Sequence, residues 1–379
     1  MFRDYFQQRR ARRRLTNVVL VGTLSLAFGW VLTRQPETPA FPIRASNQNT
    51  SASGEGSQTT GGGSGSSQIP AGPYALQEIP DAAVHDDARG SDIHVRLLFP
   101  KTAGRFKVIV YSPDDHHSQE CCEALIRAWA SHGYAIVQLT RFAALQHTDK
   151  RAGISLESVR LKRAIRARAS ATQSETPLHV SSVIDSLAAL QTRFPTIRGK
   201  LDAAHIGVVG HGTGAVAAEG IAGAVLELPG RPHSNLADPR VRAVLCISPQ
   251  GPGQSGLTEH SFDQLALPYF GITGTRDVAP PKFAAAAWHK APFEGSQPGD
   301  KYELFVQGDD ESSLVDKGLS NPADSTQNVL ASGATGTQIH AATLAFWDTY
   351  LKHDVAAKRY LQSDALVRTS RGALTLERR

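Results

Sequence analysis

Cysteine is scarce in this sequence: Cys121, Cys122 and Cys246 are the only three in 379 residues. Three thiols cannot form the disulfide framework of a small secreted domain, and no Cys/His spacing matches a zinc site. The cysteines therefore give no reason to expect a metal, and no cofactor is expected. Hydrophobic residues at 41% and charged residues at 20% are ordinary for a globular protein.

An excess of basic charge is missing from most of the chain. The formal net charge is +5, and the first fourteen residues, with six arginines and one aspartate, account for all of it. The remaining residues hold 34 basic and 34 acidic side chains. Nucleic-acid-binding domains carry clustered basic residues on the folded surface. The charge distribution argues against a nucleic acid as partner.

A run of 19 uncharged residues, 15–33, follows the arginine block. About 20 apolar residues span a bilayer, whereas a signal-peptide core is usually shorter and ends at a small-x-small site. Thr38-Pro39-Ala40 is a weak site of that kind, so a cleaved signal peptide remains the alternative. The pattern favours an uncleaved signal anchor in a cell membrane. The positive-inside rule then predicts a cytoplasmic N-terminus and an exported body, periplasmic in a bacterium.

A flexible linker separates this segment from the body. Twelve of the seventeen residues from Ser51 to Ser67 are Gly or Ser, a composition that cannot bury enough apolar surface to fold. We therefore expect five parts, bounded as follows: a cytoplasmic basic segment (1–14), a transmembrane anchor (15–33), a linker (34–72), a folded domain (73–362) and a polar C-terminal tail (363–379).

The body alternates strand and helix patterns. Apolar runs such as 134–139, 206–209 and 241–247 predict buried strands, and helical spacing of apolar residues follows most of them. This alternation predicts an α/β fold with a mostly parallel sheet and helices on both faces. In such sheets, sites gather at the carboxyl ends of the strands. Cys122 and Cys246 fall on predicted core positions and are expected to be buried hydrophobes.

A turn typical of a nucleophile elbow follows the strand at 206–209. The usual pattern, G-x-S-x-G, places a serine at the tip of a sharp strand-to-helix turn. Here the segment reads Gly210-His211-Gly212-Thr213-Gly214, and the tip residue has no side chain.

With this turn, the body resembles the α/β-hydrolase superfamily, in particular the branch of plasma platelet-activating-factor acetylhydrolases and predicted dienelactone hydrolases. The matching stretches run in family order from about Asp86 to Leu361 and are DDARGSDIHVRLLFP, FKVIVYS, AWASHGYAIVQL, IGVVGHGTG, SPQGPGQSGLTEHSF, PYFGITGTRD, APFEGSQPGDKYELFVQG and AFWDTYLKHD. The resemblance implies an α/β-hydrolase fold.

The resemblance also implies where a catalytic triad would lie. The nucleophilic serine falls on Gly212, the acid on Asp277, and the histidine on Glu311. Acyl transfer needs a nucleophilic oxygen and a base. Gly212 supplies no oxygen, and an exposed glutamate titrates near 4.3 and is a weak base at neutral pH.

The resemblance places an oxyanion hole in two segments, at 112–118 and at Thr213. The first, usually S-H-G-x-G-G-S, reads SPDDHHS here, so Pro113, Asp114 and Asp115 stand at the equivalent positions. An oxyanion hole needs backbone N–H groups aimed at developing negative charge. Replacing glycines removes backbone freedom, and Asp115 brings a carboxylate near the oxyanion position.

Two other chemistries stay open. Thr213 follows the tip, where a side chain normally points away from the site. A metal site would draw on residues at the carboxyl end of the sheet, listed here: Asp114, Asp115, His116, His117, His211, Asp277 and Glu311. Imidazole and carboxylate suit zinc or manganese, but no i, i+4 histidine pair occurs among them.

The leading hypothesis is a membrane-anchored α/β-hydrolase-like protein that is inactive as a serine hydrolase and has a binding or scaffolding role. The first alternative is an active ester or acyl hydrolase with a non-standard or metal-assisted site. A third is a structural envelope protein whose pocket is filled by side chains. The ligand and any protein partner cannot be read from the sequence.

Overall fold

A computed structural model of the chain describes residues 71–114, 122–140, 176–277, 285–310, 314 and 333–379. The chain divides into two units, 1–65 and 66–379, and every described residue belongs to the second. The expected basic segment and membrane anchor, and the linker up to residue 70, lie outside the described residues. Within the described part, no helix combines the length and apolar character needed to cross a membrane.

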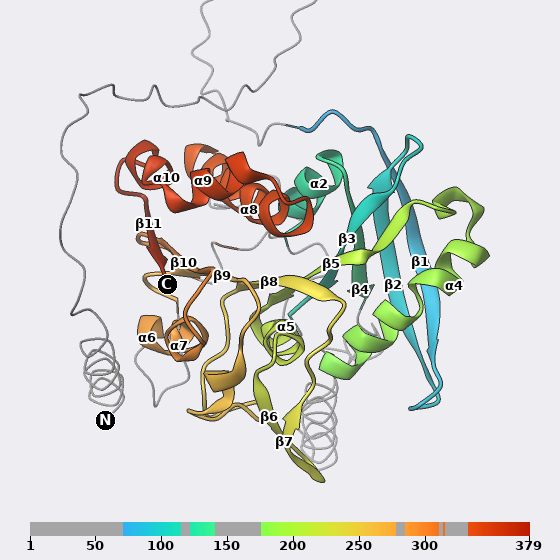
Figure 1. Ribbon diagram of the computed structural model, residues 1–379, viewed down its shortest axis with the longest axis horizontal. Helices are drawn as coiled ribbons and strands as arrows, with labels where there is room; N and C mark the ends of the chain where they lie inside the picture. Colours follow the sequence, from blue (N-terminus) through green and yellow to red (C-terminus); the bar gives the residue numbers. More distant parts are fainter. Residues whose placement is uncertain (1–70, 115–121, 141–175, 278–284, 311–313, 315–332) are drawn as a thin grey trace, which may run out of the picture. The chain divides into compact units, whose positions relative to one another are not determined.

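A nine-stranded sheet forms the centre of the second unit, in the order β1-β2-β4-β3-β5-β8-β9-β10-β11 (Figure 1). Its strands are β1 (Leu76–Asp86), β2 (Ser91–Pro100), β3 (Phe106–Ser112), β4 (Tyr134–Thr140), β5 (Leu201–His211), β8 (Val241–Ile247), β9 (Tyr269–Gly274), β10 (Lys301–Val306) and β11 (Leu374–Arg378). The strands from β4 to β10 in this order run parallel to their neighbours, while β2 is antiparallel to both β1 and β4, and β11 is antiparallel to β10. The protein therefore has an α/β fold with a mostly parallel sheet, as predicted.

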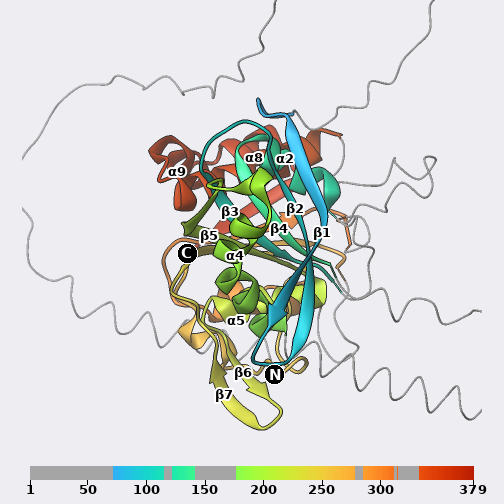
Figure 2. The ribbon, with the colours of Figure 1, turned by 90° about the vertical axis from the view of Figure 1, so that its right-hand side faces the viewer.

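Helices cover both faces of the sheet, which explains the near-continuous apolar strands. One face, the α5 face, packs against a helical segment at 176–185 and against α4 (Leu187–Arg193), α5 (Ala215–Ile221) and α7 (Ala291–Gly295). The opposite face, the α8 face, packs against α2 (Glu123–Ser131), α8 (Gly333–Leu351), α9 (Val355–Gln362) and α10 (Ala365–Thr369). In Figure 2 the two helix layers lie on opposite sides of the twisted sheet.

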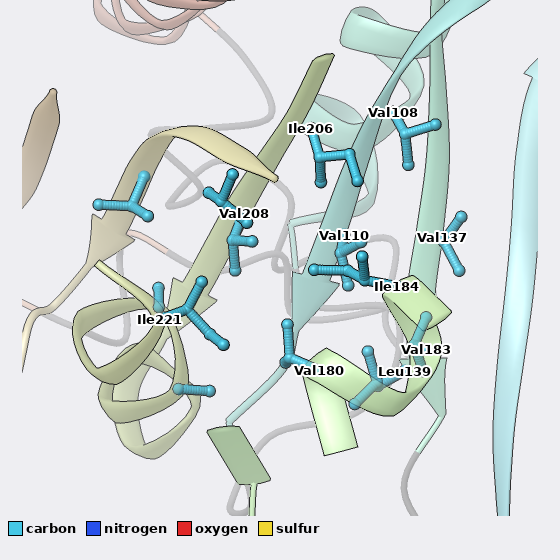
Figure 3. Packing of buried hydrophobic residues seen from close by; sticks show 14 of the residues in the cluster. Val108, Val110, Val137, Leu139, Val180, Val183, Ile184, Ile206, Val208 and Ile221 are labelled. Carbon is cyan, nitrogen blue, oxygen red and sulfur yellow. The ribbon is translucent and has the colours of Figure 1, made fainter. Parts of the chain in front are cut away.

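The α5 face shows how the sequence periodicity becomes packing. Val208 on β5 and Val110 on β3 lie under the helices, with Val180, Val183 and Ile221 directed toward them (Figure 3). These side chains are almost entirely buried. At about 25 cal/mol per Å² of apolar area, such burial is the main stabilising contribution of this layer.

Most predicted strands and helices are confirmed, and the differences have local causes. The helix expected over 215–225 ends at Ile221, because Gly223 takes a left-handed φ of 105° and Val225 begins strand β6 (Val225–Leu228). This strand pairs with β7 (Arg231–Asn235) in a hairpin that the sequence patterns did not predict.

The expected polar tail at 363–379 is instead part of the folded unit. Helix α10 lies in it, and β11 pairs with β10, placing Leu374 opposite Val306 and Leu376 opposite Leu304. Leu374 and Leu376 are buried in the α8 face. The tail reads as polar because only alternate residues of an edge strand contribute to the core.

Candidate functional site

The strand–turn–helix at Gly210–Gly214 adopts the geometry of an elbow. Strand β5 ends at His211, a 3₁₀ turn covers Gly212–Gly214, and α5 begins at Ala215. A Cβ atom on Gly210 would lie 2.4 Å from the Ala215 Cα atom, and one on Gly214 would lie 2.3 Å from the Ser112 carbonyl oxygen. Only glycine fits these two positions, so the outer glycines allow β5, α5 and the end of β3 to approach each other.

Gly212 lies at the tip of this turn with a left-handed φ of 52°. A residue with a side chain pays a steric penalty of about 1–2 kcal/mol in that region. Glycine adopts it without that strain. The chain therefore makes a sharp strand-to-helix turn here, and the residue at its tip carries no side-chain functional group.

Asp114 occupies the backbone donor beside the tip. Its Oδ2 atom accepts a hydrogen bond of 2.8 Å from the Thr213 N–H, across 99 residues of sequence. At an elbow, the N–H that follows the tip residue is the one that would stabilise an oxyanion. Here a carboxylate of the chain itself, only 5% exposed, already accepts from it. Its neighbour Pro113 has no N–H to offer.

Asp277 is fully buried in the turn after β9. Its Oδ2 atom accepts hydrogen bonds of 2.8 Å from both Ser248 Oγ and Thr273 Oγ1. Ser248 follows β8, and the preceding residue Ile247 lies opposite His211 of β5. The structure thus brings Gly212, Ser248 and Asp277 to the same carboxyl edge of the sheet.

His289 is the imidazole that faces Asp277. It ends the short helix α6 (Ala285–His289), and its Nε2 atom lies 3.4 Å from Asp277 Oδ1. Its Nδ1 atom lies 2.7 Å from the Pro249 carbonyl oxygen. A carbonyl oxygen only accepts, so Nδ1 carries a hydrogen atom. Both ring nitrogens face oxygen atoms of the protein, and the ring is 2% exposed.

This arrangement differs from a catalytic dyad. A general base in acyl transfer keeps one ring nitrogen directed at the nucleophile while the other is held by the acid. His289 has one nitrogen directed at Asp277 and the other at a main-chain carbonyl. It therefore links α6 to the residues that follow β8 and β9.

Glu311 and Asp115 lie outside the described residues, as do His116 and His117. The residues just before Glu311 are described and lie beside the end of β9: the Arg276 N–H donates to the Asp309 carbonyl oxygen at 2.9 Å, and the Gly308 N–H donates to Thr275 Oγ1 at 2.8 Å. Among the described residues, no group of three His, Cys, Asp or Glu side chains could hold a metal ion.

Sequence patterns did not single out Ser248 or His289. Both contact Asp277 only because β8, β9 and α6 converge at one edge. A lone histidine on a five-residue helix and a serine after a buried strand carry no distinctive spacing. Cys122 and Cys246 are buried, as expected.

No family model matches this chain, and no curated protein sequence matches it.

Proposed function

We propose that this protein is an α/β-hydrolase-like protein that lacks serine-hydrolase activity and has a binding or scaffolding role. The observation that carries the proposal is Gly212 at the tip of an elbow whose outer glycines admit no Cβ atom. The elbow conformation is present, and the nucleophilic oxygen that acyl transfer requires is not.

Two further contacts support the same proposal. The Thr213 N–H is bonded to the Asp114 carboxylate, so an oxyanion would have to displace a negative charge to reach this donor. Asp277 is bonded by Ser248 and Thr273, while His289 bridges Asp277 and Pro249. Each group holds another part of the chain in place.

The strand order supports the family proposal. In α/β-hydrolases the elbow ends a central parallel strand and is followed directly by a helix. A segment after another strand of the sheet reaches the residue that follows the tip. Here β5 lies between β3 and β8, and Asp114 on the segment after β3 contacts Thr213.

Hydrolysis of short-chain nitrophenyl esters by the purified full chain tests the catalytic part. We expect no hydrolysis above the spontaneous rate in buffer. The variant Gly212→Ser is expected to stay inactive as well, because the Asp114 carboxylate still accepts from the Thr213 N–H and the His289 Nε2 atom faces Asp277 Oδ1 at 3.4 Å.

The matched control is Gly199→Ser, which places the same side chain on a glycine of φ 72° with nothing within 4 Å of its Cβ position. Wild-type turnover that persists in Gly199→Ser and disappears in Asp277→Asn would refute the proposal.

We further propose that residues 15–33 tether the body to a membrane, with the arginine block on the cytoplasmic side. The double variant Leu24→Arg/Leu26→Arg is expected to leave the membrane fraction, and Ser64→Arg in the linker is the matched control. An intact mass that corresponds to a chain starting after residue 40 would instead show that a signal peptide has been cleaved.

A further inference from the structure

The residues that follow β8 form a segment, 248–252, held by side chains from two helices, α5 and α6, and from the turn after β9. These contacts are Ser248 Oγ to Asp277 Oδ2 at 2.8 Å, the Pro249 carbonyl oxygen to His289 Nδ1 at 2.7 Å, the Gln250 N–H to Glu219 Oε1 at 3.0 Å and the Pro252 carbonyl oxygen to Trp288 Nε1 at 2.9 Å. The segment therefore links the Asp277–His289 pair at the edge of the sheet to Glu219 on α5.

Glu219 is an acid placed inside the protein. It lies on α5, its exposed fraction is zero, and within the described residues its Oε2 atom has no hydrogen-bond partner. Desolvation by burial raises the pKa of its carboxyl to about 8, against an ordinary value of 4.5, and the Gln250 N–H opposes that rise only in part. Glu219 therefore holds the segment as a neutral acid at neutral pH.

A second buried acid lies on the same face of the sheet. The strand register aligns Cys246 on β8 with Gly271 on β9, and Gly271 with Glu303 on β10. A Cβ on Gly271 would lie 2.0 Å from Glu303 Oε2, so the Glu303 carboxyl lies over this glycine. Within the described residues, neither of its oxygens has a hydrogen-bond partner.

The groups around the two acids give little compensation for a negative charge. Burial raises the pKa of Glu303, and the charged groups that face it are Lys290 before α7, Glu294 on α7, Glu377 on β11 and Glu219 on α5. The Lys290 ammonium lies 2.7 Å from Glu377 and 3.3 Å from Glu294. Cys246 and Tyr269 complete the surroundings, and burial raises the pKa of both.

We propose that Glu219, with Glu303 beside it, is a proton-dependent clamp: in its neutral form it holds segment 248–252 against α5, and loss of its proton releases the segment together with its contacts to Asp277 and His289. The trigger is a rise of pH toward 8. Among the described residues, an ionised carboxylate at this position would have one N–H donor and no adjacent cation, so movement of the segment that lets water reach it reduces the free-energy cost of its charge.

The sign of the effect follows from proton linkage. In the released form Glu219 reaches water and titrates near its ordinary value of 4.5, whereas in the held form its pKa is about 8. Between these values the released form binds fewer protons, so rising pH favours it, by up to about tenfold per pH unit for one carboxyl. Above about pH 8 both forms are ionised and the dependence ends.

Hydrogen exchange of the Gln250 amide in the full chain measures this release. Positions 249 and 252 are prolines without an N–H, so Gln250 and Gly251 carry the only backbone amides between them. Mass spectrometry that separates these two amides, from pH 5 to pH 9, gives the Gln250 protection factor after correction for the intrinsic exchange rate.

The expected result is a protection factor that falls as pH rises toward 8 in the wild type and is independent of pH in Glu219→Gln. The glutamine keeps the Oε1 acceptor and has no proton to lose. Glu259→Gln, an exposed change in the same β8–β9 connection, is the matched control and should behave as the wild type. A wild-type protection factor without pH dependence, or an equal fall in Glu219→Gln, overturns the proposal.

Infrared spectroscopy of the wild type provides a second test that needs no folded variant. The proposal requires a protonated carboxyl C=O band at pH 6 that declines in parallel with Gln250 protection. Its absence at pH 6, or its persistence after protection is lost, contradicts the clamp.

Discussion

The two faces of the sheet at β10 are built from alternate residues of one strand and differ sharply in chemistry. Tyr302, Leu304 and Val306 face α8 in an apolar cluster. The alternate residues Lys301 and Glu303 are directed to the α5 face and are also buried. One face is stabilised by apolar packing, whereas the other holds a lysine and a glutamate whose pKa values burial shifts toward the neutral form.

This contrast teaches that burial alone does not make a region inert. On the α8 face Phe346 contacts Phe270 and Trp347 edge to face, with ring centroids 5.4 and 5.1 Å apart. That packing is insensitive to pH. On the α5 face, Glu219 and Glu303 have equal burial but carry protons that can be lost, so the stability of that face depends on solution conditions.

The largest expected loss of stability comes from a substitution in the apolar α8 face. Phe346→Ala removes a fully buried ring from the aromatic cluster and should reduce the free energy of unfolding by about 3–5 kcal/mol, through lost transfer energy and a residual cavity. Urea denaturation measures it. Val355→Ala, a change at a residue 63% exposed, is the control and should cost less than about 0.5 kcal/mol.

The next largest expected effect is a pH-dependent loss of stability that arises from the acids on the α5 face. The raised pKa values of Glu219 and Glu303 mean that their stabilisation is complete below about 4.5 and is lost as pH rises through the folded-state value, about 8 for Glu219. The free energy of unfolding should fall by about 1.4 kcal/mol per pH unit for each carboxyl.

The carboxyl contribution to the pH dependence is best measured between pH 6.5 and 8. Below it His340, whose pKa burial lowers to about 3 from 6.5, contributes the opposite slope; above it Lys301, lowered to about 8 from 10.5, does the same. Denaturation at fixed pH values across this window should show a smaller slope in Glu219→Gln. An unchanged slope would place the titration elsewhere.

A third change makes the α5 face resemble the α8 face. Glu303→Met replaces two buried oxygens, unpaired within the described residues, by an apolar side chain of similar length. We expect a gain of about 1–3 kcal/mol at pH 8, the cost of leaving a buried polar group without a partner. Glu259→Met on the surface is the control. Destabilisation by Glu303→Met would mean that the carboxyl has a partner that its surroundings do not reveal.

The smallest expected effect concerns the elbow, at the edge where the two faces meet. Gly212→Ala should lower stability by about 1–2 kcal/mol, because alanine is strained at φ 52°. Gly90→Ala, at φ 60° with open space around it, reports the backbone contribution alone. A much larger loss at Gly212 would indicate that a Cβ also meets its neighbours.

Much of the fold could be predicted from local patterns. Period-2 and period-3.6 spacing identified most strands and helices, because a buried face imposes its period on the sequence. Edge strand β11 was not predicted, because only Leu374 and Leu376 on it face the core. Helix α5 was predicted too long because Gly223, an ordinary residue in a small-residue run, takes a left-handed conformation.

The candidate site was predictable only in part. The elbow and Asp277 follow from spacing and resemblance, and the structure brings them to one edge. The Asp114–Thr213 contact joins positions 99 residues apart, and His289 reaches Asp277 through the packing of α6. Glu311 lies outside the described residues, so its role stays a prediction.

The sequence by itself determined which residue types are available: no oxygen at Gly212, a carboxyl at Asp277, and acids at Glu219 and Glu303 within apolar stretches. Only the tertiary structure decided what those groups contact. Strand alternation and the parallel register turned Glu303 inward over Gly271, and helix packing enclosed Glu219 beneath the Gln250 amide. Burial then raises both pKa values, because the charge of a carboxylate depends on surroundings that no local pattern encodes.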